Sequence, residues 1–479
     1  MNNKYDIVIG LEVHAELKTK TKIYCSCENK FGGEVNTQCC PVCMGMPGAL
    51  PVLNKKVVEY AVKMGHAVHC TINENLKQDR KNYIYPDLPK AYQISQFDIP
   101  LCENGYVEFM LGDEQKRVGI TRIHIEEDAG KLLHMEGFDS TLVDMNRCGV
   151  PLIEIVSEPD MSSAAEAKEY LETVKTILQY IDVSDCKMQE GSIRCDVNVS
   201  VMPKGSDQFG TRCEMKNINT FSGAMRAIEY EANRQIEIIQ NGGVIEQETR
   251  KWDDENGINV LLRSKEDAQD YRYFKEPDVM PTMLDHDWVM ALKDQIPELP
   301  NQKINRYVQD LKISKDDAEI IAKDFAKAKL FENMIASANI KAKDAANWIL
   351  GDITKYCNDK QITADEFPVS ADRLANLILL IEKGTISGSA AKKVFAAMLT
   401  KAGEPLAFVK EMGLEQISDN SALEQLVADV LANNPGTVAD YQNGKTNVLG
   451  FLVGQCMKAS RGQGNPKILS DLLLKELQK

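Results

Sequence analysis

Three short stretches of this sequence combine the alternation of a β-strand with acidic, basic and histidine side chains. Between Ile7 and Leu17, apolar residues alternate with Glu12, His14 and Glu16. The other two stretches are 193–201, with Arg194, Asp196 and Asn198 in alternate positions, and 212–216, with Arg212, Glu214 and Lys216. Because successive side chains of a strand point to opposite faces, each stretch predicts one core face and one face that carries these polar groups.

A fourth, less regular stretch, 124–131, adds Glu126, Glu127 and Asp128. The alternative interpretation of any one strand is a solvated outer face, which antiparallel sheets ordinarily have. The residue types in the four stretches together favour a metal site, because hard divalent cations such as Mg²⁺ prefer carboxylate oxygens, with waters and substrate phosphates as further ligands. Arg194 and Lys216 could then neutralise phosphate charge during phosphoryl transfer. The spacing therefore predicts a metal–nucleotide site.

Two cysteine pairs form a second group of candidate ligands. Cys25 and Cys27 are followed, after twelve residues, by Cys40 and Cys43. Two close pairs at this separation are typical of a structural zinc knuckle with four thiolate ligands, which leaves no open position for a catalytic water. The alternative is a set of buried thiols without a ligand. We predict Zn²⁺ in a folding role.

The segment 79–96 is rich in residues that can stack on rings and hold charged oxygens. It contains Lys81, Tyr83, Tyr85, Lys90 and Tyr92, together with two prolines that stiffen the chain. An ordinary surface loop is the alternative interpretation.

Composition and missing motifs exclude several classes. No P-loop, Rossmann fingerprint, serine-hydrolase elbow or zinc-protease helix motif is present. The net charge of -15 argues against indiscriminate nucleic-acid binding, so contact with DNA is not expected and any RNA contact must use a local basic surface. The sequence has no apolar run long enough for a membrane helix and no signal-peptide pattern. The spacing of its 13 cysteines is not typical of an extracellular disulfide framework. We therefore expect a cytoplasmic protein without membrane contact.

The chain is long enough for two or three domains. Residues 1–292 combine short alternating runs with helical spacing, including an amphipathic helix after the capping box at Ser163 and a second helix from about Ser222 to Gln240. Beyond the two prolines at Pro297 and Pro300 the spacing is helical. Gly403 and Pro405 interrupt it again. We predict an α+β chain with domains at 1–292, 293–404 and 405–479.

Several long motifs in this sequence resemble those of the B subunits of tRNA-dependent amidotransferases. They are Gly10-Leu11-Glu12-Val13-His14, the segments 79–96, 124–131 and 146–159, the segment 190–198, and Asp270-Tyr271-Arg272-Tyr273-Phe274, with 450–455 and 462–466 near the end. The resemblance covers essentially the whole chain. It implies a cradle-like, mixed-sheet catalytic domain, an all-α helical domain and a small helical tail domain similar to the YqeY proteins.

The resemblance also implies a reaction and partners. Glu-tRNA(Gln), Asp-tRNA(Asn) or both would be phosphorylated by ATP on the side-chain carboxylate, and ammonia would then displace the phosphate to give the amide. The ammonia would come from a glutaminase A subunit, and a small C subunit would hold the heterotrimer together. Such an enzyme is a ligase that uses glutamine as the nitrogen donor.

The site residues implied by the resemblance agree with the polar strand faces. The Mg²⁺ ligands fall on Glu12, His14 and Glu127, and the nearby acids are Glu126, Asp196 and Glu214. Nucleotide or acyl-group contacts are expected from the following residues: Lys81, Tyr83, Tyr85, Lys90, Tyr92, Arg194 and Lys216. The segment from Lys445 to Lys479 contains six basic residues and only two acidic ones. This local excess of positive charge predicts a contact with the RNA backbone. The alternative interpretation is a solvated helix end.

Two other functions fit parts of the sequence. A tRNA-binding scaffold, with phosphorylation performed by another subunit, would leave the faces of Glu12, His14 and Asp196 merely solvated. An autonomous metal-dependent kinase of a small carboxylic acid would leave the basic tail without a role. Loss of tRNA-dependent ATP cleavage on replacement of Glu127 separates these functions from that of the amidotransferase subunit.

Overall fold

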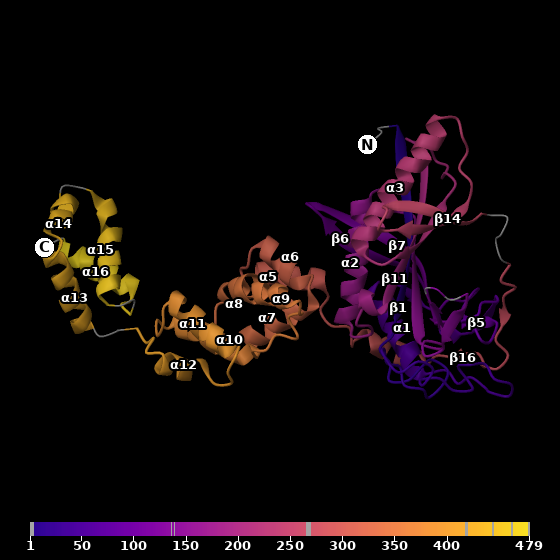
Figure 1. Ribbon diagram of the computed structural model, residues 1–479, viewed down its shortest axis with the longest axis horizontal. Helices are drawn as coiled ribbons and strands as arrows, with labels where there is room; N and C mark the ends of the chain where they lie inside the picture. Colours follow the sequence, from indigo (N-terminus) through magenta and orange to yellow (C-terminus); the bar gives the residue numbers. More distant parts are fainter. Residues whose placement is uncertain are drawn as a thin grey trace. The chain divides into compact units, whose positions relative to one another are not determined.

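The strands that carry the predicted carboxylates belong to one mixed sheet of the computed structural model (Figure 1). The structure describes residues 4–135, 137, 139–264, 270–416, 420–442, 445–460 and 463–477. Within these residues nine strands form the sheet, in the order β14 (Ile258–Ser264), β13 (Glu248–Asp253), β12 (Cys213–Ile218), β11 (Ile193–Pro203), β1 (Tyr5–Glu16), β10 (Pro151–Ser157), β7 (Glu114–Glu127), β6 (Cys102–Leu111) and β2 (Thr71–Ile72). Neighbours are antiparallel except β12 and β13, which are parallel.

One face of this sheet is the core of the N-terminal unit. Val13 of β1, Val197 of β11 and Ile155 of β10 are all completely buried. They pack in one apolar cluster with residues of the helices α1 (Lys55–Ala67), α2 (Ala164–Tyr180) and α3 (Phe221–Gln240). Because side chains alternate along each strand, burying this face fixes which residues point the other way. Five of the predicted acidic and histidine residues lie in those alternate positions: Glu12, His14, Glu126, Asp196 and Glu214.

The start of α2 predicted by the capping-box pattern is confirmed, with the Glu166 carboxylate bonded to Ser162, the residue before the cap Ser163. The Ser163 hydroxyl caps the helix by accepting a hydrogen bond of 3.2 Å from the backbone N–H of Glu166, and the Glu166 carboxylate accepts one of 2.6 Å from the N–H of Ser162. The second predicted helix begins at Phe221, after the cap residue Thr220, and ends at Gln240. Both helices are therefore readable from local signals.

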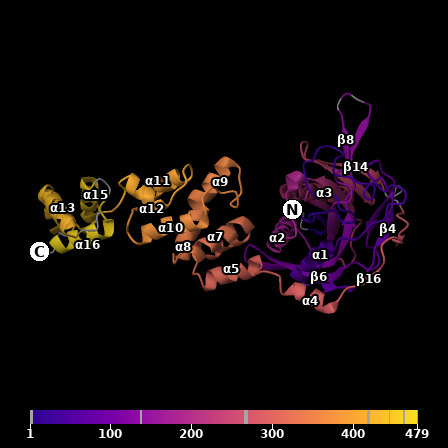
Figure 2. The same ribbon diagram turned by 90° about the horizontal axis from the view of Figure 1, so that it is seen from below.

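Smaller strands hold the segment 79–96 beside the main sheet. β15 (Phe274–Lys275), β4 (Asp79–Asn82) and β5 (Tyr92–Ser95) form one sheet, and β16 (Thr282–Met283) pairs with β3 (Asn75–Leu76). β5 is anchored to β7, because the Glu127 carboxylate and backbone carbonyl accept hydrogen bonds from the Ile94 N–H, at 2.9 Å, and the Gln93 side chain, at 2.6 Å. β8 (Lys131–His134) and β9 (Thr141–Asp144) make a hairpin that projects from the sheet (Figure 2). α4 (His286–Lys293) follows β16.

The chain divides into two compact units, Met1–Gln302 and Lys303–Lys479, with α5 (Pro300–Gln309) at the division. In the second unit the structure describes helices and no strand: α6 (Lys315–Ala322), α7 (Phe325–Ser337), α8 (Ala342–Trp348), a π-helical turn (Ile349–Ile353), α9 (Thr354–Lys360), α10 (Ala371–Glu382), α11 (Gly388–Met398), α12 (Pro405–Glu411), α13 (Asn420–Ala432), α14 (Pro435–Gln442), α15 (Leu449–Ala459) and α16 (Pro466–Leu477). The α+β class is confirmed. The boundaries at 292 and 404 stay predictions.

Candidate functional site

Strand register places His14 in a row of polar side chains on the face opposite the core. His14 of β1 is paired with Glu154 of β10, and Glu154 with His124 of β7. Paired residues of neighbouring strands point to the same side, so these three side chains meet. The Nε2 atoms of His14 and His124 lie 3.4 and 3.2 Å from Glu154 Oε2, and His14 Nε2 lies 3.7 Å from Glu126 Oε1. His14, Glu126 and Glu154, the His14 cluster, have potential ligand atoms within 4.8 Å of one another.

Charges in the His14 cluster are strongly coupled. Burial lowers the pKa of His14, but the hydrogen bond and charge of Glu154 outweigh it and raise the pKa to about 9. His124 is likewise raised to a pKa of about 9 against its burial, chiefly by the charge of Glu154 and the hydrogen bond to Glu126. Burial raises the pKa of Glu154, but the two imidazoles hold it well below its ordinary value. Two imidazolium groups therefore offset the charge of the two buried carboxylates, and Lys81 interacts with the same two carboxylates.

A second group of carboxylates lies on the neighbouring strands. Glu12 of β1, Asp196 of β11 and Glu214 of β12 form the Glu12 cluster, again with ligand atoms within 4.8 Å. Burial, followed by repulsion from Glu154, Glu214 and Asp196, raises the pKa of Glu12. The ammonium group of Lys216 contacts Asp196 and lies 2.9 Å from Glu214 Oε1, so it offsets part of this negative charge.

A cavity of about 210 Å³ opens beside the Glu12 cluster. Its lining residues are Glu12, Asn198, Arg212, Glu214, Gln247, Glu248, Thr249, Arg263, Ser264 and Tyr271. The Asn198 side chain donates a hydrogen bond of 3.0 Å to Glu12, and the Thr249 hydroxyl one of 2.8 Å to Glu214. Carboxylates, which can bind a cation, and guanidinium groups, which can bind phosphate oxygens, therefore lie at the same opening.

The predicted grouping of Glu12, His14 and Glu127 differs from the arrangement in the structure. Glu127 directly follows Glu126 on β7, so the two side chains point to opposite faces. Glu127 accepts a hydrogen bond from the backbone of Ile94 and forms an ion pair with Lys90. Among the described residues Glu126, rather than Glu127, lies with His14, and Glu12 belongs to the other cluster.

The remaining predicted contacts are divided between two sides of the segment 79–96. The ammonium group of Lys81 lies 5.9 Å from the ring centre of Tyr83, and the charge of Glu126 acts on it. Tyr85 is more than half exposed. Lys90 and Tyr92 lie on the other side, where the Lys90 ammonium group is 5.4 Å from the Tyr92 ring centre. The structure therefore does not bring Lys90 and Tyr92 to the carboxylate face.

Arg194 follows the predicted face but is bound to an acid of its own. Its guanidinium group donates a hydrogen bond of 2.8 Å to Asp128, which also lies 3.4 Å from Arg147. Burial, then the charge of Asp128, raises the pKa of Glu16 beside this pair to about 8. Arg194 thus closes one end of the polar face and has its charge already balanced.

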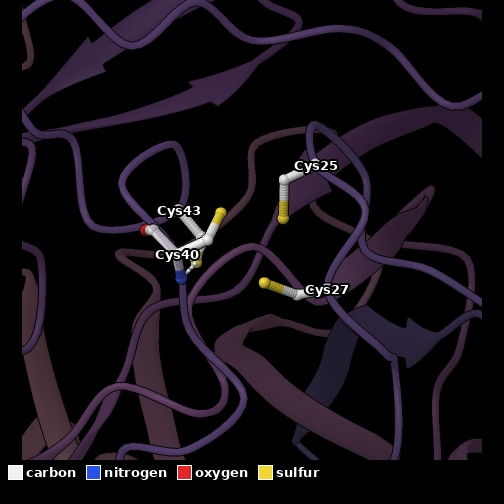
Figure 3. Close-up of side chains that lie close together, drawn as sticks. All are labelled: Cys25, Cys27, Cys40 and Cys43. Atoms are coloured by element: carbon white, nitrogen blue, oxygen red, sulfur yellow. Dashed lines mark hydrogen bonds between the residues drawn. The ribbon is translucent and has the colours of Figure 1, made fainter.

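The four predicted zinc ligands converge, as Figure 3 shows. Their sulfur atoms lie within 4.8 Å of one another, and Cys40 and Cys43 are 3.9 Å apart. The hydrogen bond from Cys25 lowers the pKa of the Cys43 thiol to about 5 and raises the pKa of Cys25, so it favours one thiolate within the pair. Buried Lys22 holds the loop by donating hydrogen bonds to the carbonyls of Gln38 and Cys148, at 2.7 and 2.8 Å.

Residue-type reasoning did not select Glu154 and His124 as site residues. β10 reads Pro-Leu-Ile-Glu-Ile-Val-Ser, and its one acid, Glu154, is only 8% exposed. A single charged residue in an otherwise apolar strand is the signal that could have found it, because buried charges are usually paired or bind metals. His124 lies two positions before Glu126 on β7, so its side chain points to the same face of the sheet.

Comparisons with known proteins identify the family. Residues 7–290 match the family model described as the GatB/GatE catalytic domain, and residues 329–477 match the one described as the GatB domain. Proteins named as the B subunit of aspartyl/glutamyl-tRNA(Asn/Gln) amidotransferase are 54% identical over 480 residues in Caldicellulosiruptor bescii, 52% over 476 in Thermoanaerobacter pseudethanolicus and 50% over 476 in Clostridium tetani. Each comparison covers 99% of this chain and at least 99% of the relative.

The match over residues 7–290, which contain the mixed sheet with its polar face, thus defines this unit as a GatB/GatE catalytic domain. Within that class, the chain belongs to the family of the aspartyl/glutamyl-tRNA(Asn/Gln) amidotransferase B subunits. Among the described residues, no helix has the length and apolar character required to cross a membrane.

Proposed function

We propose that this chain is the subunit of a tRNA-dependent amidotransferase that phosphorylates the side-chain carboxylate of Glu-tRNA(Gln), Asp-tRNA(Asn) or both. The observation that carries the proposal is the pair of carboxylate clusters on adjacent strands, beside an opening lined by Arg212 and Arg263, in a chain of this family. One carboxylate oxygen of the aminoacyl group attacks the γ-phosphorus of ATP, and the bond to ADP breaks. Ammonia then attacks the acyl carbon and phosphate leaves with the bonding electrons, taking up the proton that ammonia loses.

The chain's own residues would position the two substrates. Arg212 and Arg263, at the rim of the cavity, can meet phosphate oxygens as negative charge shifts toward ADP. Lys216, which contacts Asp196 and Glu214, can exchange these carboxylates for a phosphate oxygen. Lys81, beside Glu126, supplies a cation on the side of the His14 cluster, while Lys90 and Tyr92 support the segment behind it.

The His14 cluster fits a divalent cation. Its two carboxylates are buried, and the imidazolium groups that offset part of their charge can lose their protons when a metal ion binds. We assign His14, Glu126 and Glu154 as the groups that hold Mg²⁺, with the Glu12 cluster beside them, in place of the expected set with Glu127. A bound Mg²⁺ would neutralise charge on the ATP phosphates. The two carboxylates in this set also suit Mn²⁺.

Cys25, Cys27, Cys40 and Cys43 fit Zn²⁺ by their number, their sulfur donor atoms and the short distances between those atoms. Zinc would fix the loop 25–43 without taking part in the reaction. The other proposed partners are the glutaminase A subunit and the small C subunit of the heterotrimer. Lys445, Lys458, Lys467 and Lys475 are exposed and would contact the tRNA backbone, whereas Arg461 and Lys479 lie outside the described residues.

The test uses the purified complex and both misacylated tRNAs. Glu126→Gln should abolish ATP cleavage that depends on misacylated tRNA, while hydrolysis of glutamine by the complex continues. Glu108→Gln, on β6 of the same sheet, is the matched control and should retain both activities. ATP cleavage that persists in Glu126→Gln would favour a scaffold that only binds tRNA. Activity with a free carboxylic acid would favour an autonomous kinase.

A further inference from the structure

Five aromatic rings form a continuous row on the carboxylate side of the segment 79–96. We name Tyr85, Tyr83, Tyr271, Tyr273 and Phe97, in that order, the aromatic row. The ring centres of successive members lie 6.1, 5.9, 6.2 and 4.2 Å apart, and the last pair, Tyr273 and Phe97, is stacked at an angle of 11°. Both ends of the row are open to solvent, since Tyr85 is 52% and Phe97 is 58% exposed.

The backbone holds the two halves of this row together. Asn82, at the end of β4, donates a backbone hydrogen bond of 2.9 Å to the Tyr271 carbonyl and a side-chain hydrogen bond of 2.8 Å to the Arg272 carbonyl. Arg272 has a φ of 41°, an uncommon value for a residue other than glycine. Tyr271 and Tyr273 are thereby fixed beside Tyr83, although nearly two hundred positions of sequence separate them from it.

The ammonium group of a lysine lies in the middle of the row. The Lys81 ammonium group is 4.8 Å from the ring centre of Tyr271 and 5.9 Å from that of Tyr83. Within the described part of the chain, Lys81 forms no ion pair, although Glu126 and Glu154 are near enough to raise its pKa against its burial. A half-buried cation between two rings matches an anion that arrives with a ring system, such as a nucleotide.

The row leads to the site at which the reaction takes place. Tyr271 lines the cavity beside the Glu12 cluster, and the charges of Glu154 and Glu126 act on Tyr273. Aromatic rings in series, interleaved with basic groups, are the usual platform for single-stranded nucleic acid, because every base has a face that can stack. Five rings are more than one base can cover, so the row exceeds what the adenine of ATP requires.

We propose that the aromatic row with Lys81 binds the single-stranded 3′ end of the misacylated tRNA and leads its acyl group to the carboxylate clusters. This inference rests on the proposed function, because the acyl group to be phosphorylated is carried by the last nucleotide of that strand. Bases stack on exposed Phe97, which is itself stacked on the half-buried ring of Tyr273, and the Lys81 ammonium group meets a backbone phosphate. The row is a binding surface and takes no part in the chemical step.

The test compares ring-removing and ring-keeping variants in the complete complex. Phe97→Ala and Tyr273→Ala should each raise the KM for misacylated tRNA about tenfold or more, the usual effect of losing one stacked base, with kcat and the KM for ATP retained. Phe97→Tyr and Tyr273→Phe keep the rings and should behave as the unchanged protein. Phe274→Ala is the matched control, because this ring is also half exposed but lies beside Arg80, on the other side of β4.

A direct measurement uses tRNA with 2-aminopurine in place of the 3′-terminal adenine. Binding to the unchanged complex should quench its fluorescence, and Phe97→Ala should relieve the quenching while Phe274→Ala does not. An unchanged KM for tRNA in both alanine variants would overturn the inference, as would a raised KM for ATP alone, which would place the base of ATP on the row. If the unchanged complex cleaved no ATP with misacylated tRNA, the proposed function itself would fail, whatever the variants did.

Discussion

Glu154 is the residue whose replacement most directly tests the His14 cluster. It is 8% exposed and lies within 3.4 Å of two imidazoles, so Glu154→Gln removes a negative charge while keeping the shape of the side chain. At an effective dielectric constant of about 20, a unit charge about 4 Å from a divalent cation contributes roughly 8 kcal/mol of direct attraction. Much of this is offset, because the same carboxylate is paired with His14 and His124 when the ion is absent.

The net effect can still be bounded from below. Changing a group that merely orients a metal ligand typically weakens metal affinity by ~10–100-fold. Loss of a ligand carboxylate should cost at least about 100-fold. We therefore expect the Mg²⁺ concentration that half-activates ATP cleavage by the complex, measured with misacylated tRNA, to rise by at least about 100-fold in Glu154→Gln. Glutamine hydrolysis should be unchanged.

The control for this variant is Glu158→Gln, an exposed carboxylate just beyond the same strand, which accepts a hydrogen bond of 2.8 Å from Thr121. It should keep the Mg²⁺ dependence of the unchanged protein. An unaltered Mg²⁺ dependence in Glu154→Gln, with full ATP cleavage, would refute the assignment of the His14 cluster as the metal site.

Two further predictions concern the supports of the site. Cys40→Ser should lower the zinc content of the purified protein, measured by elemental analysis, and make the loop 25–43 sensitive to protease. Cys39→Ser changes a cysteine outside the four-thiol set and should do neither. Equal zinc content in the two variants would count against the zinc site. Glu231→Ala should reduce the free energy of unfolding, measured by denaturant titration, by about 3 kcal/mol or more. The reason is that Glu231 is fully buried and accepts hydrogen bonds of 2.6 and 2.9 Å from Arg234. Glu229→Ala, at an exposed position of the same helix, should change this free energy little. Burial raises the pKa of Glu231, but the hydrogen bonds from Arg234 and Gln235 outweigh burial and hold the pKa below 4.5. The stabilisation by Glu231 is therefore present above pH 4.5 and is lost as the pH falls through the folded-state pKa. A stability difference between the two variants that did not change in acid would contradict this prediction.

The sequence by itself determined the local elements and most of the polar face. Period-two alternation selected β1, β11 and β12, since burying one face of a sheet leaves the alternate residues on the other. The capping box at Ser163 and Glu166 fixed the start of α2. The four cysteines were also predictable, because they lie in one short segment and their spacing reflects the geometry of the site itself.

Strand order and register were decided only by the tertiary structure. Alternation shows that Glu126 and Glu127 point to opposite sides, but not which side faces His14; the pairing of β7 with β10, and of β10 with β1, decides this in favour of Glu126. The same pairing brings Glu154 between two histidines. Contacts between Tyr83 and Tyr271 likewise depend on a chain segment that returns to β4 from far along the sequence, and local patterns carry no information about such distant pairings.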